Sequence, residues 1–500
     1  MISAHREVVL SGGAFGGTGI GHTADARTGR GEDRGECRGS RESRHGDGAP
    51  GEAAYREAVA ALQARGRFGI RLGLGRTRAL LRELGDPHLG VRGALVAGTN
   101  GKGSVQALVA GVLREAGRRV GQTPKPHLVE YRERIVVDGQ EIGGEDFARL
   151  IGEVLAAAER VPRRLGPPTE FELLTAAAFL WFARTRVELA VVEVGLGGRL
   201  DATNVWDGGV AVVTNVAFDH TDRLGSTLAA IAREKAAIVK PGDLAVTGCT
   251  GEGLAVIRRR ARRLGVPLTE VAAPAVLSMD RRGIIVDAPG LGPTRCGLLG
   301  RHQAANVGVA LATLDALEAA GLATTPSDAR RAGLAAARWP GRLELIPLPQ
   351  PTGEGGPSGT AADLVLDGAH NPAGFQALLT ALAELRTQLA GGRFTLVVAF
   401  MADKDVAGIL DHCAASPLLA GARILATRVE VERAMPSPEL AAAWRRRLPR
   451  AEVVAVEPLE QALEQALEIA GREGGLLVVA GSLYLVGAAR GGLARQGLVA

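Results

Sequence analysis

Lysine is scarce in this chain: of its 59 basic residues only five are lysines, and the rest are arginines. The five are Lys102, Lys125, Lys235, Lys240 and Lys404. Arginine serves wherever any positive charge is enough, so each retained lysine is a candidate for chemistry that a guanidinium group cannot perform. The surroundings of these lysines are therefore the first places to look for a functional site.

Lys102 lies in a glycine-rich turn, residues 98–104, that reads Gly-Thr-Asn-Gly-Lys-Gly-Ser. Such a turn lets backbone N–H groups converge on phosphate oxygens, while the lysine reaches the β- and γ-phosphates and the serine hydroxyl holds Mg²⁺. An apolar run before the turn predicts a strand, and run 105–116 predicts an amphipathic helix, as this motif requires. We predict that the ATP phosphates are bound by Gly98, Thr99, Asn100, Gly101, Lys102, Gly103 and Ser104.

Two acids and a histidine accompany this turn. Glu172 begins an otherwise apolar helical run, where a carboxylate is either a helix N-terminal charge or a metal ligand. Glu193 ends an apolar strand that leads into the glycine-rich segment 195–204, and an acid there can orient Mg²⁺ or its water shell. His220 follows the third predicted strand, beside the phosphate loop, where this position favours a ligand over a structural histidine.

Lys235 lies among alanines in the helical run 231–240. Burial shifts a lysine towards its neutral form, which can react with CO₂ to give a carbamate, an anion able to bind Mg²⁺. Alternatively, Lys235 forms an ion pair with Glu234 or another nearby acid. The residues alone leave both interpretations open. Lys240, just before a Pro-Gly pair, is interpreted as a helix C-terminal cation.

From residue 93 onward, apolar strands alternate with helices, which predicts parallel sheets covered by helices on both faces. Ligands of such sheets bind beyond the carboxyl ends of the strands, and the loops described above all follow strands. Segment 272–293 is interpreted as a small β-meander, and residues 343–346 as a further strand. The other candidate strands are 93–97, 189–194, 210–216, 244–247, 364–366, 394–399, 423–427 and 476–479.

A chain of 500 residues exceeds what one hydrophobic core usually serves, so more than one domain is expected. We expect a disordered N-terminal extension over 1–52, an ATP-binding domain over 53–338, a hinge at 339–342 and a second α/β domain over 343–500. The Pro-, Gly- and Ser-rich segment 349–360 is interpreted as a surface loop of the second domain.

Composition excludes several classes of function. The apolar fraction of 46% suits globular domains, and the net charge of +5 is small for this length. The arginine clusters at 258–263 and 445–447 lie in helical patterns without interleaved aromatic residues, so nucleic-acid binding is not supported. The four cysteines are isolated, and no apolar run is long enough for a membrane span. We expect a soluble, cytoplasmic protein with reduced thiols and no membrane partner.

Besides the phosphate loop, further motifs follow one another along the chain at 126–128, 133–135, 171–172, 193–204, 219–220, 234–236, 302–303, 339–342, 367–372, 403–405 and 481–484. The order of these motifs resembles that of the folylpolyglutamate synthase/dihydrofolate synthase family, a branch of the Mur ligase superfamily. The likeness runs from about residue 55 to about 490. It implies a P-loop ATPase domain of the Mur ligase central type, a C-terminal Rossmann-like domain, and catalysis between the two.

The resemblance implies an ATP-dependent ligase. ATP phosphorylates the carboxylate of dihydropteroate or a reduced folate, and the amine of L-glutamate attacks the acyl phosphate. Positioning and charge neutralisation, with two Mg²⁺ ions, would dominate such catalysis. We expect both activities in one monomer. One alternative is a Mur-type ligase acting on a different carboxylate, disfavoured because no separate domain for a nucleotide-linked sugar precedes the phosphate loop. A P-loop switch protein would not need the second domain.

The resemblance also implies roles for individual residues. Catalysis falls on Lys102, Lys235, His220 and Glu172. Metal ligation falls on Ser104, on Glu172 and His220 for a second Mg²⁺, and on Lys235 as a carbamate. Nucleotide contacts beyond the phosphate loop fall on Gln303, Asn306, Arg342, Asp367 and His370. The pterin-side and substrate positions are Leu72, Gly73, Leu74, Pro126 and His127.

The chain departs from the family at one metal position. The family usually has a serine before Pro-His-Leu that helps to bind the second Mg²⁺, whereas this chain has Lys125. An ammonium group cannot ligate Mg²⁺ but can replace part of its charge, so we hypothesise that the second metal site is altered here. Two departures are milder: Ala237 stands where glycine is usual, and Met401-Ala402 precede the Asp-Lys-Asp around Lys404.

Overall fold

The computed structural model describes residues 49–66, 73–349 and 361–499. Leu72, almost all of the predicted extension and all but the first residue of the loop 349–360 lie outside the described residues. None of the helices in the described ranges combines the length and the apolar character that a membrane crossing needs.

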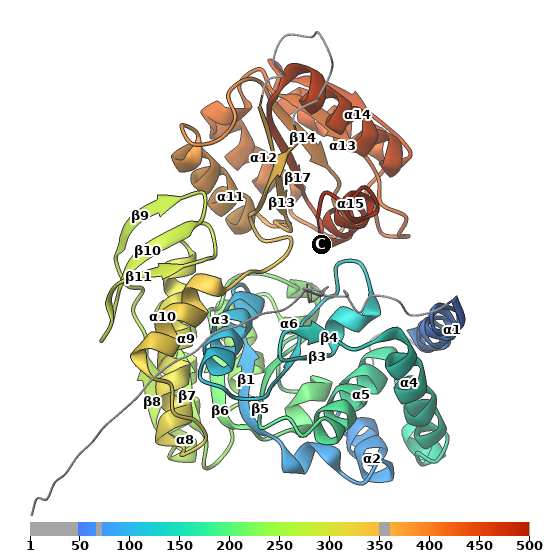
Figure 1. Cartoon of the computed structure of the whole chain (residues 1–500), viewed down its shortest axis with the longest axis vertical. Coiled ribbons are helices and arrows are strands. Elements are labelled where there is room, and N and C mark those ends of the chain that lie inside the picture. The colour runs from blue at the N-terminus through green and yellow to red at the C-terminus, as the bar shows by residue number, and fades with distance from the viewer. Residues whose placement is uncertain (1–48, 67–72, 350–360, 500) are drawn as a thin grey trace, which may run out of the picture. The chain divides into compact units, whose positions relative to one another are not determined.

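The first sheet has eight strands in the order β4-β3-β2-β5-β1-β6-β7-β8 (Figure 1). Neighbours from β2 to β8 are parallel, and only the short β3 is reversed, since it is antiparallel to both β2 and β4. The chain places β2 and β5 on one side of β1 and β6 to β8 on the other, so β1 is the switch point of the sheet. Sheets of this kind bind ligands beyond the carboxyl ends of the strands at the switch point. The strands are β1 Arg92–Ala97, β2 Val120–Thr123, β3 Val136–Val137, β4 Gln140–Glu141, β5 Leu189–Glu193, β6 Gly209–Val213, β7 Leu244–Thr247 and β8 Leu268–Glu270.

Helices cover both faces of this sheet. Successive side chains of a strand point to opposite faces, and because both sets are apolar here, each face forms a hydrophobic core with its helices. Leu95 and Ala97 of β1 belong to one core, whereas Ala94 and Val96 belong to the other. The first core takes residues from α1 Ala49–Gly66, α2 Gly75–Glu83, α4 Gly144–Ala158, α5 Glu170–Arg184, α7 Leu228–Ala236 and α8 Gly251–Leu264. The second takes them from α3 Lys102–Glu115, α9 Gln303–Ala319 and α10 Ser327–Ala336.

A three-stranded antiparallel sheet follows, made of β9 Val276–Asp280, β10 Gly283–Ala288 and β11 Gly292–Cys296. Ile284 and Val286 of β10 are buried and join the second core. The β-meander predicted within 272–293 is therefore confirmed, and it extends to Cys296.

The last sheet has the order β12-β13-β17-β14-β15-β16, with only β12 antiparallel to its neighbour. Its strands are β12 Glu344–Leu348, β13 Ala362–Asp367, β14 Phe394–Val398, β15 Arg423–Ala426, β16 Glu452–Ala455 and β17 Gly475–Ala480. One core contains residues of α11 Pro372–Leu385, α12 Val406–Ala415 and α13 Ser437–Arg447; the other contains residues of α14 Leu459–Glu473 and α15 Leu483–Arg495. The α/β fold class is as predicted.

Several predicted boundaries are wrong in detail. The third strand, β6, ends at Val213 instead of residue 216, so His220 lies at the far end of the following loop, as the N-cap of the short helix α6 Thr221–Leu224. Helix α7 ends at Ala236, so Lys240 is not in a helix; its ammonium donates to Asn204 Oδ1 at 2.9 Å and to the Trp206 carbonyl at 2.8 Å. Lys240 therefore fixes a loop, and the exact domain limits stay a prediction.

Candidate active site

The phosphate loop joins β1 to α3, and contacts with the segment after β6 fix its shape. The Thr99 N–H donates to the Asn215 carbonyl at 3.1 Å, and the Asn100 N–H donates to Asn215 Oδ1 at 2.9 Å. The Thr214 hydroxyl donates to the Asn100 carbonyl at 2.7 Å. These contacts hold the loop in one conformation at the start of α3, with helix N–H groups available to an anion.

At two positions of the phosphate loop, neighbouring side chains come so close that only glycine fits. Gly101 has φ +81°, which disfavours a side chain, and a Cβ there would meet the Asn306 side chain. A Cβ at Gly103 would lie 2.5 Å from the Trp339 ring. The loop therefore packs against α9 and against the predicted hinge, which brings segments more than 200 residues apart to one place.

Lys102 and Lys235 share one acceptor, the Gly98 carbonyl, at 3.2 Å and 2.9 Å respectively. Lys235 is only 4% exposed, and burial, with a smaller effect of Lys102, lowers the pKa of Lys235 to about 7. Glu234 is paired instead with Arg199, at 2.8 Å. The interpretation of Lys235 as the partner of Glu234 is therefore wrong. With a pKa of about 7, the Lys235 amine is neutral in a substantial fraction of the molecules at pH 7.

Loops of both large sheets line one cleft. The lining residues include the phosphate loop from Thr99 to Ser104 and most of the predicted nucleotide positions. Gly98, Lys235, His127, Gly73 and Leu74 are not among them, although Lys235 reaches the phosphate loop through Gly98. Other lining residues include Lys125, Pro126, Arg134, Phe171, Glu172, Glu193, Asp201, Asp219, His220, Gln303, Asn306, Arg342, Asp367, His370, Lys404, Arg433 and Ser482.

Glu193, the last residue of β5, is 3% exposed and lines the cleft. Burial raises the pKa of Glu193, while Lys102, Lys125 and Arg342 oppose this effect. Mg²⁺ is usually bound by one or two carboxylates together with phosphate oxygens, so Glu193 and the buried Ser104 hydroxyl fit one Mg²⁺ beside the phosphate loop. Within the described ranges, no group of three or more His, Cys, Asp or Glu could hold a metal by itself.

Glu172 is already engaged by protein groups. Both carboxylate oxygens accept from Arg76 Nε, at 3.1 and 3.0 Å, and the pair is almost fully buried. Oε2 also accepts from the Thr169 N–H at 2.8 Å, which completes a capping box at the start of α5. Of the two alternatives for Glu172, the structure supports the helix N-terminal charge. Metal ligation would add a second cation to a carboxylate whose charge Arg76 already balances.

His220 lies in the left-handed conformation with φ +48°, and its ring Nε2 is 3.7 Å from Asp219 Oδ2. Burial lowers the pKa of His220, which favours the neutral ring, although Asp219 opposes this effect. Lys404, which follows β14, donates to Asp219 Oδ1 at 3.3 Å. The predicted Asp-Lys-Asp motif thus contacts the loop that carries His220.

Asp367 and His370 follow β13. The Asp367 carboxylate accepts from the Leu343 N–H at 2.7 Å and from the Ala369 N–H at 2.8 Å, while burial raises its pKa. His370 Nδ1 lies 2.8 Å from the Gly368 carbonyl, which favours a proton on that nitrogen and leaves Nε2 as an acceptor. Burial lowers the pKa of His370 to about 4, so the ring is neutral at pH 7.

Two family models match this chain: the Mur ligase middle domain over residues 96–314 and the Mur ligase glutamate ligase domain over 354–483. The chain is 35% identical over 361 residues to dihydrofolate synthase/folylpolyglutamate synthase of Bacillus subtilis, covering 70% of this chain and 80% of that relative. The chain belongs to the folylpolyglutamate synthase/dihydrofolate synthase family. The Mycobacterium tuberculosis relative is 34% identical over 459 residues, covering 83% and 89%. The ligase assignment is confirmed.

Solved structures agree with this assignment. The folylpolyglutamate synthase of Mycobacterium tuberculosis, solved with ADP and AMPPCP, superposes with a TM-score of 0.75 at 32% identity over 88% of this chain and 98% of that one. Escherichia coli FolC with DHPP and ADP gives 0.73 at 27% identity, covering 88% and 98%. The predicted fold of the ligase, two Mur-type α/β domains, is therefore confirmed.

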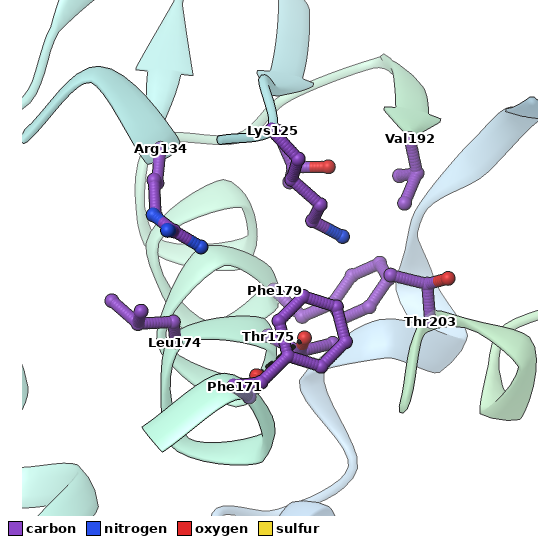
Figure 2. A pocket seen from close by; sticks show the side chains of 9 residues that line it. Lys125, Arg134, Phe171, Leu174, Thr175, Phe179, Val192 and Thr203 are labelled. Atoms are coloured by element: carbon purple, nitrogen blue, oxygen red, sulfur yellow. Dashed lines mark hydrogen bonds between the residues drawn. The ribbon is translucent and has the colours of Figure 1, made fainter. Parts of the chain in front are cut away.

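On the predicted substrate side of this ligase, the loop after β2 contributes Pro126 to the cleft. His127 does not line it; its Nδ1 accepts from Arg134 Nε at 2.7 Å, and burial, with nearby Arg134, lowers the pKa of His127 to about 3. Leu74 is the N-cap of α2. A side cavity, drawn in Figure 2, lies between Lys125, Arg134 and the rings of Phe171 and Phe179.

Proposed function

We propose that this ligase joins L-glutamate to the carboxylate of dihydropteroate or a reduced folate, with ATP as co-substrate. The names of the Bacillus subtilis and Mycobacterium tuberculosis relatives support both substrates. The observation that carries the proposal is the single cleft that is lined by the phosphate loop on one side and by Asp367, His370 and Lys404 on the other.

The phosphate loop binds the β- and γ-phosphates of ATP through the N–H groups at the start of α3 and through the Lys102 ammonium. Gln303, Asn306, Arg342, Asp367 and His370 surround the rest of the nucleotide. Ser104 and Glu193 would hold Mg²⁺ together with the phosphates, and the bound ion would neutralise charge on the transferred phosphoryl group. The contact of Trp339 with Gly103 supports a nucleotide site that spans the hinge.

The reaction has two displacements. A carboxylate oxygen of the substrate attacks the γ-phosphorus, and the bond from that phosphorus to the oxygen of the β-phosphate breaks, which releases ADP. The glutamate nitrogen then attacks the acyl carbon, and phosphate leaves with the electron pair of the C–O bond. The proton that the amine loses passes to the departing phosphate.

The amine substrate needs a place for its own carboxylates. Lys404, Arg433 and the hydroxyl of Ser482 line the cleft from the second domain. Cations and hydroxyl groups are suitable partners for carboxylates, and Lys404 is held in place by Asp219. We assign glutamate binding to this group of three residues.

The test is the substrate dependence of ADP release by the purified ligase. The proposal requires fast ADP release only when both a pteroate or folate and glutamate are present with ATP. ADP release that is equally fast with ATP alone would refute it. Release that depends on an amino acid but not on any pteroate or folate would instead favour a Mur-type ligase for another carboxylate.

A further inference from the structure

Lys125 is attached to Glu193 at two points. Its backbone N–H donates to Glu193 Oε2 at 3.2 Å, and its ammonium donates to the main-chain carbonyl of Glu193 at 2.6 Å. Because these bonds involve both ends of Lys125, its position relative to the Glu193 carboxylate is fixed. Lys125 therefore places a positive charge beside the acid that we assign to Mg²⁺.

An aromatic ring holds the same ammonium from another side. Lys125 Nζ lies 4.6 Å from the centroid of the Phe171 ring, a favourable cation–π distance. Figure 2 shows the Lys125 side chain directed between Phe171 and Thr203, at the edge of the side cavity. Phe171 is itself packed closely, since a Cβ at Gly195 would lie 2.8 Å from its ring. The ammonium thus has a built site within the protein.

The nearby acids leave little room for a second divalent ion. Asp201 accepts four hydrogen bonds, from the N–H groups of Gly195, Leu196 and Thr203 and from the Thr203 hydroxyl, so it serves the loop. Glu172 is bound on both oxygens by Arg76. The Glu172 carboxylate thus lies against a guanidinium group, while the Glu193 carboxylate accepts from the Lys125 N–H and its main-chain carbonyl holds the Lys125 ammonium.

We propose that the Lys125 ammonium is a fixed cation that takes the place of a second Mg²⁺, so that the ligase binds one divalent ion per nucleotide. The charge lies beside Glu193, where a phosphate or an acyl phosphate enters the cleft. This inference rests on the proposed function for its nucleotide and its metal, but not on the identity of the acyl substrate. It applies to this chain because it depends on a lysine at position 125.

The test counts divalent ions directly. Mn²⁺ is titrated into the full-length ligase saturated with a non-hydrolysable ATP analogue, and free Mn²⁺ is measured by electron paramagnetic resonance. The wild type is expected to bind one Mn²⁺ per chain. Lys125→Ser, which supplies a hydroxyl ligand and removes the charge, is expected to bind two. Lys125→Met is the matched control: it removes the charge without a ligand and is expected to bind one.

A second readout separates charge from packing. Lys125→Met is expected to lower kcat by roughly 100-fold, about 2.7 kcal/mol in barrier, with no recovery at high Mg²⁺, whereas Lys125→Ser recovers activity as Mg²⁺ rises. Two Mn²⁺ in the wild type, or one in a folded Lys125→Ser, overturns the inference. If Lys125→Ser does not fold, the number of Mn²⁺ ions bound per wild-type chain alone decides: one supports the inference and two overturn it. One bound Mn²⁺ without any glutamylated product would refute the proposed function and leave this inference standing.

Discussion

The amine of Lys235 lies 2.9 Å from the carbonyl oxygen of Gly98, the first residue of the phosphate loop. The same carbonyl accepts from Lys102 at 3.2 Å, so two lysines meet at one oxygen. Burial brings the pKa of Lys235 to about 7, so this amine can lose its proton near neutral pH. We propose different chemistry for the two lysines: phosphate binding for Lys102 and carbamate formation for Lys235.

Carbamate formation predicts that activity depends on CO₂. Only the neutral amine reacts, so the dependence is expected above a pH of about 7, where the Lys235 amine loses its proton. Enzyme in CO₂-free buffer at pH 8 should lose most of its activity and regain it with added bicarbonate. Lys235→Ala should be inactive with or without bicarbonate. Wild-type activity that does not respond to bicarbonate would contradict the carbamate.

Lys235 should also lower stability in a pH-dependent way. Its pKa is about 7 in the folded chain and its ordinary value is 10.5, so the unfolded chain binds the proton more tightly. The loss of folding free energy caused by burying the charged amine is fully present below pH 7 and disappears as pH rises from 7 to 10.5. Lys235→Met should therefore have a higher Tm than the wild type at pH 6, and this advantage should shrink at pH 9. A Tm difference that is independent of pH would be contrary to this account.

The contact between Gly103 and Trp339 predicts a specific loss of nucleotide affinity. A Cβ at Gly103 would lie 2.5 Å from the indole ring. Gly103→Ala is expected to weaken ADP binding roughly 10-fold or more, about 1.4 kcal/mol, measured by calorimetry. Gly152→Ala is the matched control, because Gly152 is an exposed position of α4 with no atom within 4 Å of a Cβ. Equal ADP affinity in both variants would argue against the contact.

The two alternative roles of Glu172, helix N-terminal charge and metal ligand, predict different effects of its substitution on stability and on Mn²⁺ affinity. If Glu172 serves Arg76 and the start of α5, Glu172→Gln should cost about 3 kcal/mol of stability and leave Mn²⁺ affinity in the nucleotide complex unchanged. Arg76→Met should show a similar loss, and the double variant should lose less than the sum. The measurements are Tm and Mn²⁺ titration. A fall in Mn²⁺ affinity without a fall in Tm would restore Glu172 as a metal ligand.

Substitution of Lys404 is expected to change the kinetics for glutamate but not for ATP. It is held by Asp219 and lines the cleft from the second domain. Lys404→Met is expected to lower kcat/KM for glutamate by roughly 100-fold, about 2.7 kcal/mol, through loss of a charge-assisted contact, with little change in the KM for ATP. Steady-state kinetics in each substrate measures this. An equal rise in both KM values would place Lys404 with the nucleotide instead.

The local parts of this site could be predicted from the sequence. The phosphate loop is contiguous, and its strand and helix follow from the adjacent apolar pattern. Asp367 and His370 belong to one motif after a strand. The long β strands could be predicted because they are continuously apolar, whereas β2, Val-Gly-Gln-Thr, has one large apolar residue and gave no signal.

Contacts between distant residues could not be predicted. Arg76 and Glu172 are 96 positions apart, and Lys235 and Gly98 are 137 apart. Nothing in either local pattern indicates its partner, so the ion pair of Glu172 and the true acceptor of Lys235 appear only in the fold. The local sequence predicts that Glu193 can orient Mg²⁺, but its two bonds with Lys125 depend on the pairing of β2 with β5.

The most direct test of the account is the product of the complete reaction. Purified ligase is incubated with ATP, Mg²⁺, L-glutamate and either dihydropteroate or tetrahydrofolate, and the products are weighed by mass spectrometry. The account predicts a pteroate or folate product heavier by one glutamyl residue, formed one for one with ADP and phosphate. ADP that accumulates without any glutamylated product from either acceptor would contradict it.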